Sequence, residues 1–152
     1  MQLTSSQIIL VVEDSDDDYE MLEEALKDGD STALKNPIHR CEDGKSAQDF
    51  LSMHCDKSSR PEDVSIGLIL LDLNLPGISG HRVLEFIKTN KLLKKIPVIV
   101  LTTSNDDRDI DECYDLGANT YIQKPVDLEK FLLSIQRLKE YWFNIAILPK
   151  ER

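Results

Sequence analysis

Short apolar runs alternate along the chain with segments whose apolar residues recur at helical spacing. The first run, 8–12, is followed by Leu22, Ala25 and Leu26 on one helical face, and Gly29 is expected to end that helix. Further runs predict strands over 37–41, 66–71, 98–101 and 120–123. The helices after them are predicted from four sets of apolar positions: Ala47, Phe50, Leu51, His54; Gly80, Val83, Leu84, Ile87; Ile110, Cys113, Tyr114; Leu128, Phe131, Leu132, Ile135, Leu138. The pattern therefore predicts five strand–helix units.

The predicted strands are apolar on both faces, and this property decides the fold class. A half-exposed strand would alternate polar and apolar residues, whereas strands of a parallel sheet are covered by helices on each side. Five such units predict a flavodoxin-like α/β fold, an open doubly wound parallel sheet with strand order 2-1-3-4-5. In that order the chain reverses direction between strands one and three, and ligands bind there, beyond the carboxyl ends of the strands.

Length, charge and cysteine content restrict the class of protein. The 152 residues, 41% hydrophobic and 30% charged, fit a single domain over 1–152, with a core over about 7–142, a polar loop over 55–65 and an apolar tail over 143–152. A net charge of -10 disfavours nucleic acid and anionic membranes as partners. The start of the chain does not resemble a signal peptide, and the 3 cysteines form no C-x-x-C pair. We therefore expect a cytoplasmic protein.

Side chains able to do chemistry follow four of the predicted strands. Glu13 and Asp14 follow the first strand, Asp72 the third, Thr102 lies at the end of the fourth, and Lys124 follows the fifth. Under the predicted strand order the three carboxylates meet at the reversal, where their repulsion requires a cation, and oxygen ligands with an open face suit Mg²⁺. With a hydroxyl and an ammonium group opposite, the site is suited to a phosphoryl group on a carboxylate nucleophile, the role that we favour for Asp72.

Each of these signals also has a purely structural explanation. Acids over 13–18 suit a solvated helix N-terminus, and Asp72 shortly before Pro76 suits a turn. Thr102 suits a helix cap, and Lys124 an ordinary surface position. Their joint placement at the ends of four strands favours a site.

Three segments of the chain resemble the response regulator receiver family. They are LILLDLNLPGISG over 68–80, IPVIVLTTS over 96–104 and GANTYIQKP over 117–125. The resemblance implies a two-component signalling protein that is phosphorylated on Asp72 by a sensor histidine kinase. It also implies a stoichiometric switch with slow autodephosphorylation rather than an enzyme, and output through protein contacts with no attached output domain.

The same resemblance assigns the metal ligands. It implies Mg²⁺ bound by Asp14, Asp72 and the backbone carbonyl of Asn74, with Glu13 acting through a coordinated water. Many relatives have aspartate at the position of Glu13, and the extra methylene favours such a water-mediated contact.

The resemblance also implies how the switch operates. The Thr102 hydroxyl would move toward the phosphoryl group, Tyr121 would swing inward behind it, and Lys124 would pair with the phosphoryl group. The bond between Lys124 and Pro125 is expected to be cis, a conformation that is accessible only before proline.

A narrower resemblance is to single-domain regulators that partner bacterial and cyanobacterial phytochrome histidine kinases. It depends on D-L-N-L-P-G-x-x-G, L-T-T-S, G-A-N-x-Y-I-x-K-P and the pair Tyr141-Trp142. It implies that a phytochrome is a candidate for the partner kinase.

Apolar residues continue past the fifth predicted helix, at Tyr141, Trp142, Phe143, Ile145, Ile147 and Leu148. One helix face cannot bury all of them against its own sheet. Either the tail folds back over the domain, or these residues form a self-complementary surface. We favour the second interpretation and expect a two-fold homodimer through the fourth helix, fifth strand, fifth helix and tail.

Two other functions fit parts of the pattern. A Mg²⁺-dependent phosphatase or nuclease has a similar acid cluster, but the phosphatases with an aspartate nucleophile have D-x-D at the first strand, a nuclease needs a basic surface, and no P-loop is present. A receiver that acts as a constitutive interaction module would not need Asp72, Thr102 and Lys124. Turnover of a phosphorylated substrate would indicate the first, and binding unchanged by a phosphoryl mimic the second.

Overall fold

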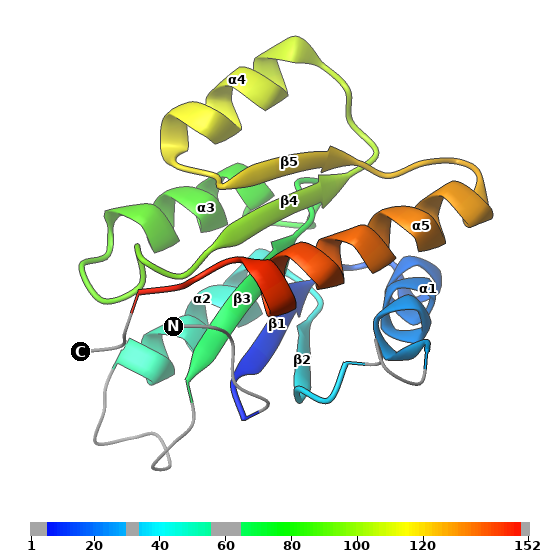
Figure 1. Ribbon diagram of the computed structural model, residues 1–152. Coiled ribbons are helices and arrows are strands. Elements are labelled where there is room, and N and C mark those ends of the chain that lie inside the picture. Colours follow the sequence, from blue (N-terminus) through cyan, green and yellow to red (C-terminus); the bar gives the residue numbers. More distant parts are fainter. Residues whose placement is uncertain (1–5, 30–33, 56–64, 150–152) are drawn as a thin grey trace.

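The computed structural model describes residues 6–29, 34–55 and 65–149. Within them the five strands are β1 (Ile8–Val12), β2 (Ile38–Cys41), β3 (Ile66–Leu71), β4 (Val98–Thr102) and β5 (Thr120–Gln123). They form one sheet in the order β2-β1-β3-β4-β5, and every neighbouring pair is parallel (Figure 1). The predicted fold class and strand order are confirmed. Most of the predicted polar loop, 56–64, lies outside the described residues.

Helices cover both faces of this sheet (Figure 1). They are α1 (Asp16–Lys27), α2 (Gly44–Cys55), α3 (Gly80–Thr89), α4 (Asp107–Leu116) and α5 (Leu128–Lys139), and a π-helical segment, η1 (Glu140–Ile145), continues α5. Helices α1 and α5 pack against each other on one face, while α2, α3 and α4 lie on the other. None of the helices in the described part of the chain is long and apolar enough to span a membrane.

The strands supply the centre of both apolar layers because successive residues point to opposite faces. Leu10 and Val12 of β1 face α2 and α3, whereas Ile9 and Val11 face α1 and α5, and all four are at most 1% exposed. Burying one such side chain stabilises the fold by roughly 1.5–3 kcal/mol. Burial on both faces explains why β1 has no polar position until Glu13.

The first turn of α1 begins directly behind the end of β1. Ser15 is its N-cap, and its hydroxyl accepts a hydrogen bond from the backbone N–H of Asp18 at 3.2 Å. Asp16, Asp17 and Asp18 occupy the first turn, where the helix dipole stabilises negative charge. The cap therefore places an acidic helix start beside the strand end that carries Glu13.

The apolar residues after α5 divide between the core and the surface. Trp142 and Phe143 pack against the core between α1 and α5. Tyr141, Ile145 and Ile147 are 51%, 59% and 78% exposed. Part of the tail therefore folds back over the domain, and part of it remains an exposed apolar surface; residues 150–152 lie outside the described part.

Candidate functional site

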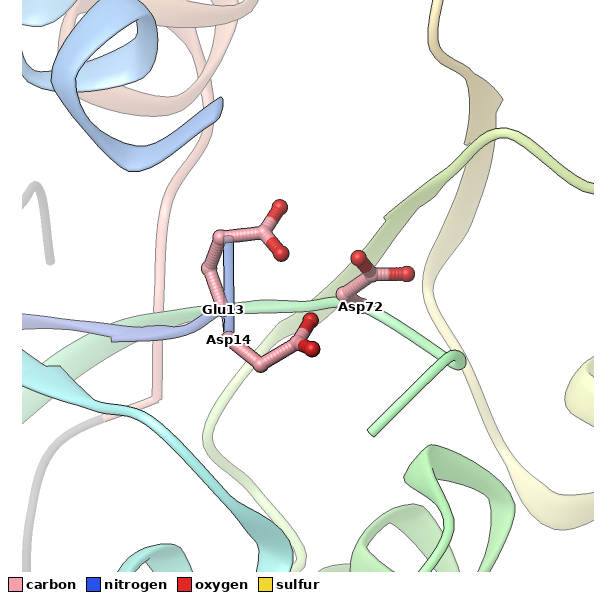
Figure 2. Close-up of side chains that lie close together, drawn as sticks. All are labelled: Glu13, Asp14 and Asp72. Carbon is pink, nitrogen blue, oxygen red and sulfur yellow. The ribbon is translucent and has the colours of Figure 1, made fainter. Parts of the chain in front are cut away.

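The acids at the ends of β1 and β3 converge as the strand order requires. Figure 2 shows the carboxyl groups of Glu13, Asp14 and Asp72 turned toward one another, and each offers an oxygen within 4.8 Å of the others. Glu13 and Asp72 are 3% and 6% exposed. Asp14 is exposed, so the group is open on one side.

Backbone hydrogen bonds fix these positions. The N–H of Asp72 donates to the carbonyl of Val12 at 3.0 Å, and the N–H of Glu13 donates to the carbonyl of Cys41 at 3.0 Å. A Cβ at Gly80, the first residue of α3, would collide with the carbonyl of Asp72. The sheet and the start of α3 therefore hold the Asp72 backbone from two sides.

Lys124 brings a single positive charge to this group of acids. Its side chain is 9% exposed, and its Nζ forms ion pairs with Glu13, with Asp18 at 3.0 Å and with Asp72 at 3.1 Å. The backbone N–H of Lys124 donates to the carbonyl of Thr102 at the end of β4, which fixes where the lysine leaves the sheet. Three carboxylates thus contact one ammonium group, and Asp14 adds a fourth carboxylate beside two of them.

Burial and excess negative charge shift the ionisation of the site. Burial raises the pKa of the Glu13 carboxyl to about 7; Lys124 opposes the rise and Asp72 adds to it. For Lys124, burial lowers the pKa, but the hydrogen bond with Glu13 and the charge of Asp72 outweigh burial and raise its pKa above the usual range. Lys124 is therefore charged, and the site holds protons tightly when it lacks further positive charge.

The hydroxyl predicted to contact a phosphoryl group is buried without a partner. Thr102 is 0% exposed, and its Oγ1 has no hydrogen-bond partner among the described residues. A buried hydroxyl without a partner costs on the order of 1–3 kcal/mol, so it signals a group that is kept for something other than stability. Tyr121 on β5 is partly buried, and its hydroxyl donates to the carbonyl of Ser104 at 2.8 Å.

Two sequence expectations beside the site have different outcomes. The backbone N–H of Asn74 donates to Asp72 Oδ1 at 3.1 Å, so the residue expected to supply a metal-binding carbonyl lies next to Asp72. The expected cis bond before Pro125 is wrong, because the described residues contain no cis peptide bond. The trans form is the intrinsically preferred one before proline as well, by about 0.5–1 kcal/mol.

Sequence reasoning did not assign a role in the site to Asp18. Its contact with Lys124 joins residues that are 106 positions apart. The signal that could have found it is its place four residues after Asp14, in the first turn of the helix that starts at the site.

The donor set fits a divalent cation of the hard, oxygen-binding kind. Three carboxylates with oxygens within 4.8 Å of one another, of which one is exposed, can bind Mg²⁺ or Mn²⁺ and leave ligand positions open. The single ammonium group leaves negative charge in excess, which such a cation would neutralise. Fold and site together define a doubly wound α/β domain with an acidic, cation-binding strand edge.

A family model for the response regulator receiver domain matches residues 9–136. Response regulator Rcp1 of Synechocystis sp. is 36% identical over 143 residues, which cover 94% of this chain and 93% of Rcp1. The chain belongs to the response regulator receiver family and is a response regulator of the two-component type.

Two solved structures show which members of the family it is similar to. The phosphorylated cyanobacterial phytochrome response regulator RcpA superimposes with a TM-score of 0.83 at 34% identity, covering 95% of this chain and 99% of that chain. The Mn²⁺-bound form of Rcp1 superimposes with a TM-score of 0.81 at 36% identity, covering 94% of this chain and 99% of that chain. The similarity therefore extends over nearly the whole domain of both regulators.

Proposed function

We propose that Asp72 is the phosphoacceptor of this receiver domain and that a phosphohistidine of a sensor kinase is the donor. The observation that carries this assignment is the position of Asp72, where a buried carboxylate meets Glu13, Asp14 and the Lys124 ammonium at 3.1 Å. A carboxylate oxygen of Asp72 attacks phosphorus as the P–N bond to the histidine breaks, which yields an acyl phosphate.

The surrounding residues stabilise the added charge. Lys124 donates to a phosphoryl oxygen, and the Thr102 hydroxyl gains the partner that it lacks among the described residues. Asp14, Asp72 and the backbone carbonyl of Asn74 would hold Mg²⁺, with Glu13 acting through a water. When bound, Mg²⁺ neutralises the charge that builds up during transfer.

Phosphorylation would alter the face formed by α4, β5 and α5. As the Thr102 hydroxyl moves toward the phosphoryl group, the space behind it admits Tyr121. Tyr121 then gives up its hydrogen bond to Ser104, in the loop that leads to α4. The result is a shift in a pre-existing equilibrium of this face, with output through protein contacts.

Labelling from a small phosphodonor tests the phosphoacceptor. Incubation with ³²P-labelled acetyl phosphate and Mg²⁺ should give one phosphate per chain that hydroxylamine and base release, and Asp72→Asn should abolish the label. Asp115→Asn, which removes the same charge from an exposed position on α4, should label like wild type. Stable label on Asp72→Asn would refute the assignment, and continuous turnover of a phosphomonoester would favour a phosphatase instead.

The partner kinase is proposed to be of the phytochrome type. Both the kinase and this protein are proposed to be cytoplasmic. The support is the similarity to RcpA, a cyanobacterial phytochrome response regulator, over 95% of the chain. Phosphotransfer profiling against the histidine kinases of the host tests this proposal. A phytochrome kinase should transfer phosphoryl groups fastest, and a marked preference for an unrelated sensor would contradict it.

The protein is further proposed to form a two-fold homodimer through α4, β5, α5 and the tail. Tyr114 on α4, Leu133 on α5 and Tyr141, Ile145 and Ile147 beyond it are 50–78% exposed, so this side of the molecule presents apolar surface. Light scattering at micromolar concentration should give a dimer, and Ile147→Asp should give more monomer. A monomer with and without a phosphoryl mimic would dispose of the proposal.

A further inference from the structure

The Lys124 ammonium group is fully engaged before any phosphoryl group arrives. An ammonium group has three N–H donors. Its three ion-pair partners, Glu13, Asp18 and Asp72, account for all of them. A phosphoryl oxygen can therefore gain a donor from Lys124 only when one carboxylate withdraws.

The three carboxylates differ in the cost of withdrawal. The side chains of Glu13 and Asp72 are 5% and 7% exposed, so either would remain dehydrated without its donor. The side chain of Asp18 is 39% exposed and can exchange the ammonium group for water. The first turn of α1 also stabilises the negative charge of Asp18 in place. Asp18 is therefore the partner that leaves at the lowest cost.

The surroundings of Asp18 give its side chain room to move. A cavity of about 180 Å³ opens between α1 and the segment after β5, and Asp18, Met21, Thr103 and Lys124 are among the residues that line it. The carboxylate of Asp18 can turn into this space without displacing the backbone of α1.

We propose that Asp18 is a positioning residue that competes with the phosphoryl group for Lys124 and thereby weakens phosphoryl binding at Asp72. This inference rests on the proposed function of Asp72. When the phosphoryl group binds, one N–H of Lys124 exchanges the Asp18 carboxylate for a phosphoryl oxygen, and Asp18 becomes hydrated. No covalent bond changes in this exchange. Asp18 sets how strongly the switch holds its phosphoryl group.

Titration with beryllofluoride, a noncovalent phosphoryl mimic, in the presence of Mg²⁺ tests the inference. Asp18→Asn keeps the size of the side chain but removes its charge, and it should bind beryllofluoride about two- to fivefold more tightly, as expected for a partly exposed ion pair. The gain should shrink at high salt because an exposed charge is screened. Asp18→Glu, which keeps the charge, should bind like wild type.

Asp17→Asn is the matched control, because it removes the same charge from the same helical turn. Among the described residues the ion pairs of Lys124 do not include Asp17. Its affinity for beryllofluoride should change by less than about 1.5-fold. A purely structural role of Asp18 would lower the melting temperature of the ligand-free protein without tightening binding, whereas we expect that temperature to stay within about 2 °C of wild type.

Each other outcome has a defined meaning. Equal gains in Asp17→Asn and Asp18→Asn would show a general charge effect and overturn the inference. Weaker binding in Asp18→Asn would also overturn it, because Asp18 would then hold Lys124 in its productive position. Absence of binding to the wild type, or undiminished binding to Asp72→Asn, would instead refute the proposed function.

Discussion

Replacing Lys139 with methionine should destabilise the domain more than the same replacement of an exposed lysine in the same helix. Lys139 lies at the end of α5 and is 3% exposed. Its Nζ donates to the carbonyls of Ala25 and Leu26, both at 3.1 Å, and of Asp28 at 3.0 Å. These are carbonyls at the end of α1, where no further helical N–H is available to them. Lys139 thus ties α5 to the end of α1.

The expected loss follows from the hydrogen bonds that the variant removes. Methionine preserves most of the apolar stem. Two of the three carbonyls belong to the buried residues Ala25 and Leu26, whereas Asp28 is exposed and its carbonyl can bind water. The carbonyls of Ala25 and Leu26 each keep one other donor, because Gln136 Nε2 donates to the first at 3.3 Å and the N–H of Leu34 donates to the second at 2.9 Å. At about 0.5–1.5 kcal/mol net per hydrogen bond, the loss of the two bonds from Lys139 costs roughly 1–3 kcal/mol. Burial lowers the pKa of Lys139, which reflects a desolvation cost that the variant recovers. We therefore expect a net loss of about 1–2 kcal/mol.

Urea and thermal unfolding measure this loss. A loss of this size lowers the melting temperature by about 2–8 °C for a domain of this length. Lys130→Met, at an exposed position of α5, is the control and should stay within about 0.5 kcal/mol of wild type. Equal stability of the two variants would show that the three hydrogen bonds only balance the burial of the ammonium group, and would refute the reasoning.

Three other substitutions, one of them with a control, probe the site and the sheet edge. Thr102→Val removes a buried hydroxyl that has no partner within the described ranges, and it should raise the free energy of unfolding by about 1 kcal/mol in urea. Tyrosine fluorescence should then no longer respond to beryllofluoride, and a loss of stability would contradict the prediction. Gly80→Ala, whose Cβ would meet the backbone of Asp72, the proposed phosphoacceptor, should cost about 1–3 kcal/mol in urea and slow labelling. Its control, Gly77→Ala, has open space at φ 71°, should cost about 1–2 kcal/mol and should label normally. Burial and the charge of His54 lower the pKa of His39, so the folded state takes up a proton there less readily than the unfolded state does. Stability should therefore decline as the pH falls below 6.5. Urea midpoints measured between pH 7.5 and 5 should decline less in His39→Gln than in wild type, and equal slopes would contradict this.

The sheet and the meeting of the acids could be predicted from the sequence because both follow from strand periodicity. Runs such as Ile66–Leu71 are apolar at every position, and the structure buries every one of them. Once strands of one parallel sheet are ordered, their carboxyl ends lie at one edge, so Glu13, Asp14 and Asp72 had to be neighbours.

The features that the sequence did not reveal are contacts between single polar groups on separate elements. Asp18 and Lys124, or Lys139 and the end of α1, meet across 106 to 114 positions and leave no periodic trace. The π-helix that continues α5 from Glu140 contains no proline or glycine from which it could have been predicted. Such contacts depend on where the polar end of each side chain lies, and the packing of the helices on the sheet determines that position.

Stability and chemistry reside in different parts of this molecule. The two apolar layers are fully formed. The strand edge instead holds crowded carboxylates, a hydroxyl that finds no partner in the described part of the chain, and an ammonium group with all three donors engaged. The burial of the two apolar layers offsets the free-energy cost of the polar groups at the strand edge, so these groups can be retained for function. A divalent cation and a phosphoryl group would relieve these conditions together, because one supplies positive charge to the acids and the other supplies acceptors to Thr102 and Lys124. Their binding therefore changes the balance at the edge without disturbing the core, and the response can pass to α4 and β5 while the sheet remains intact.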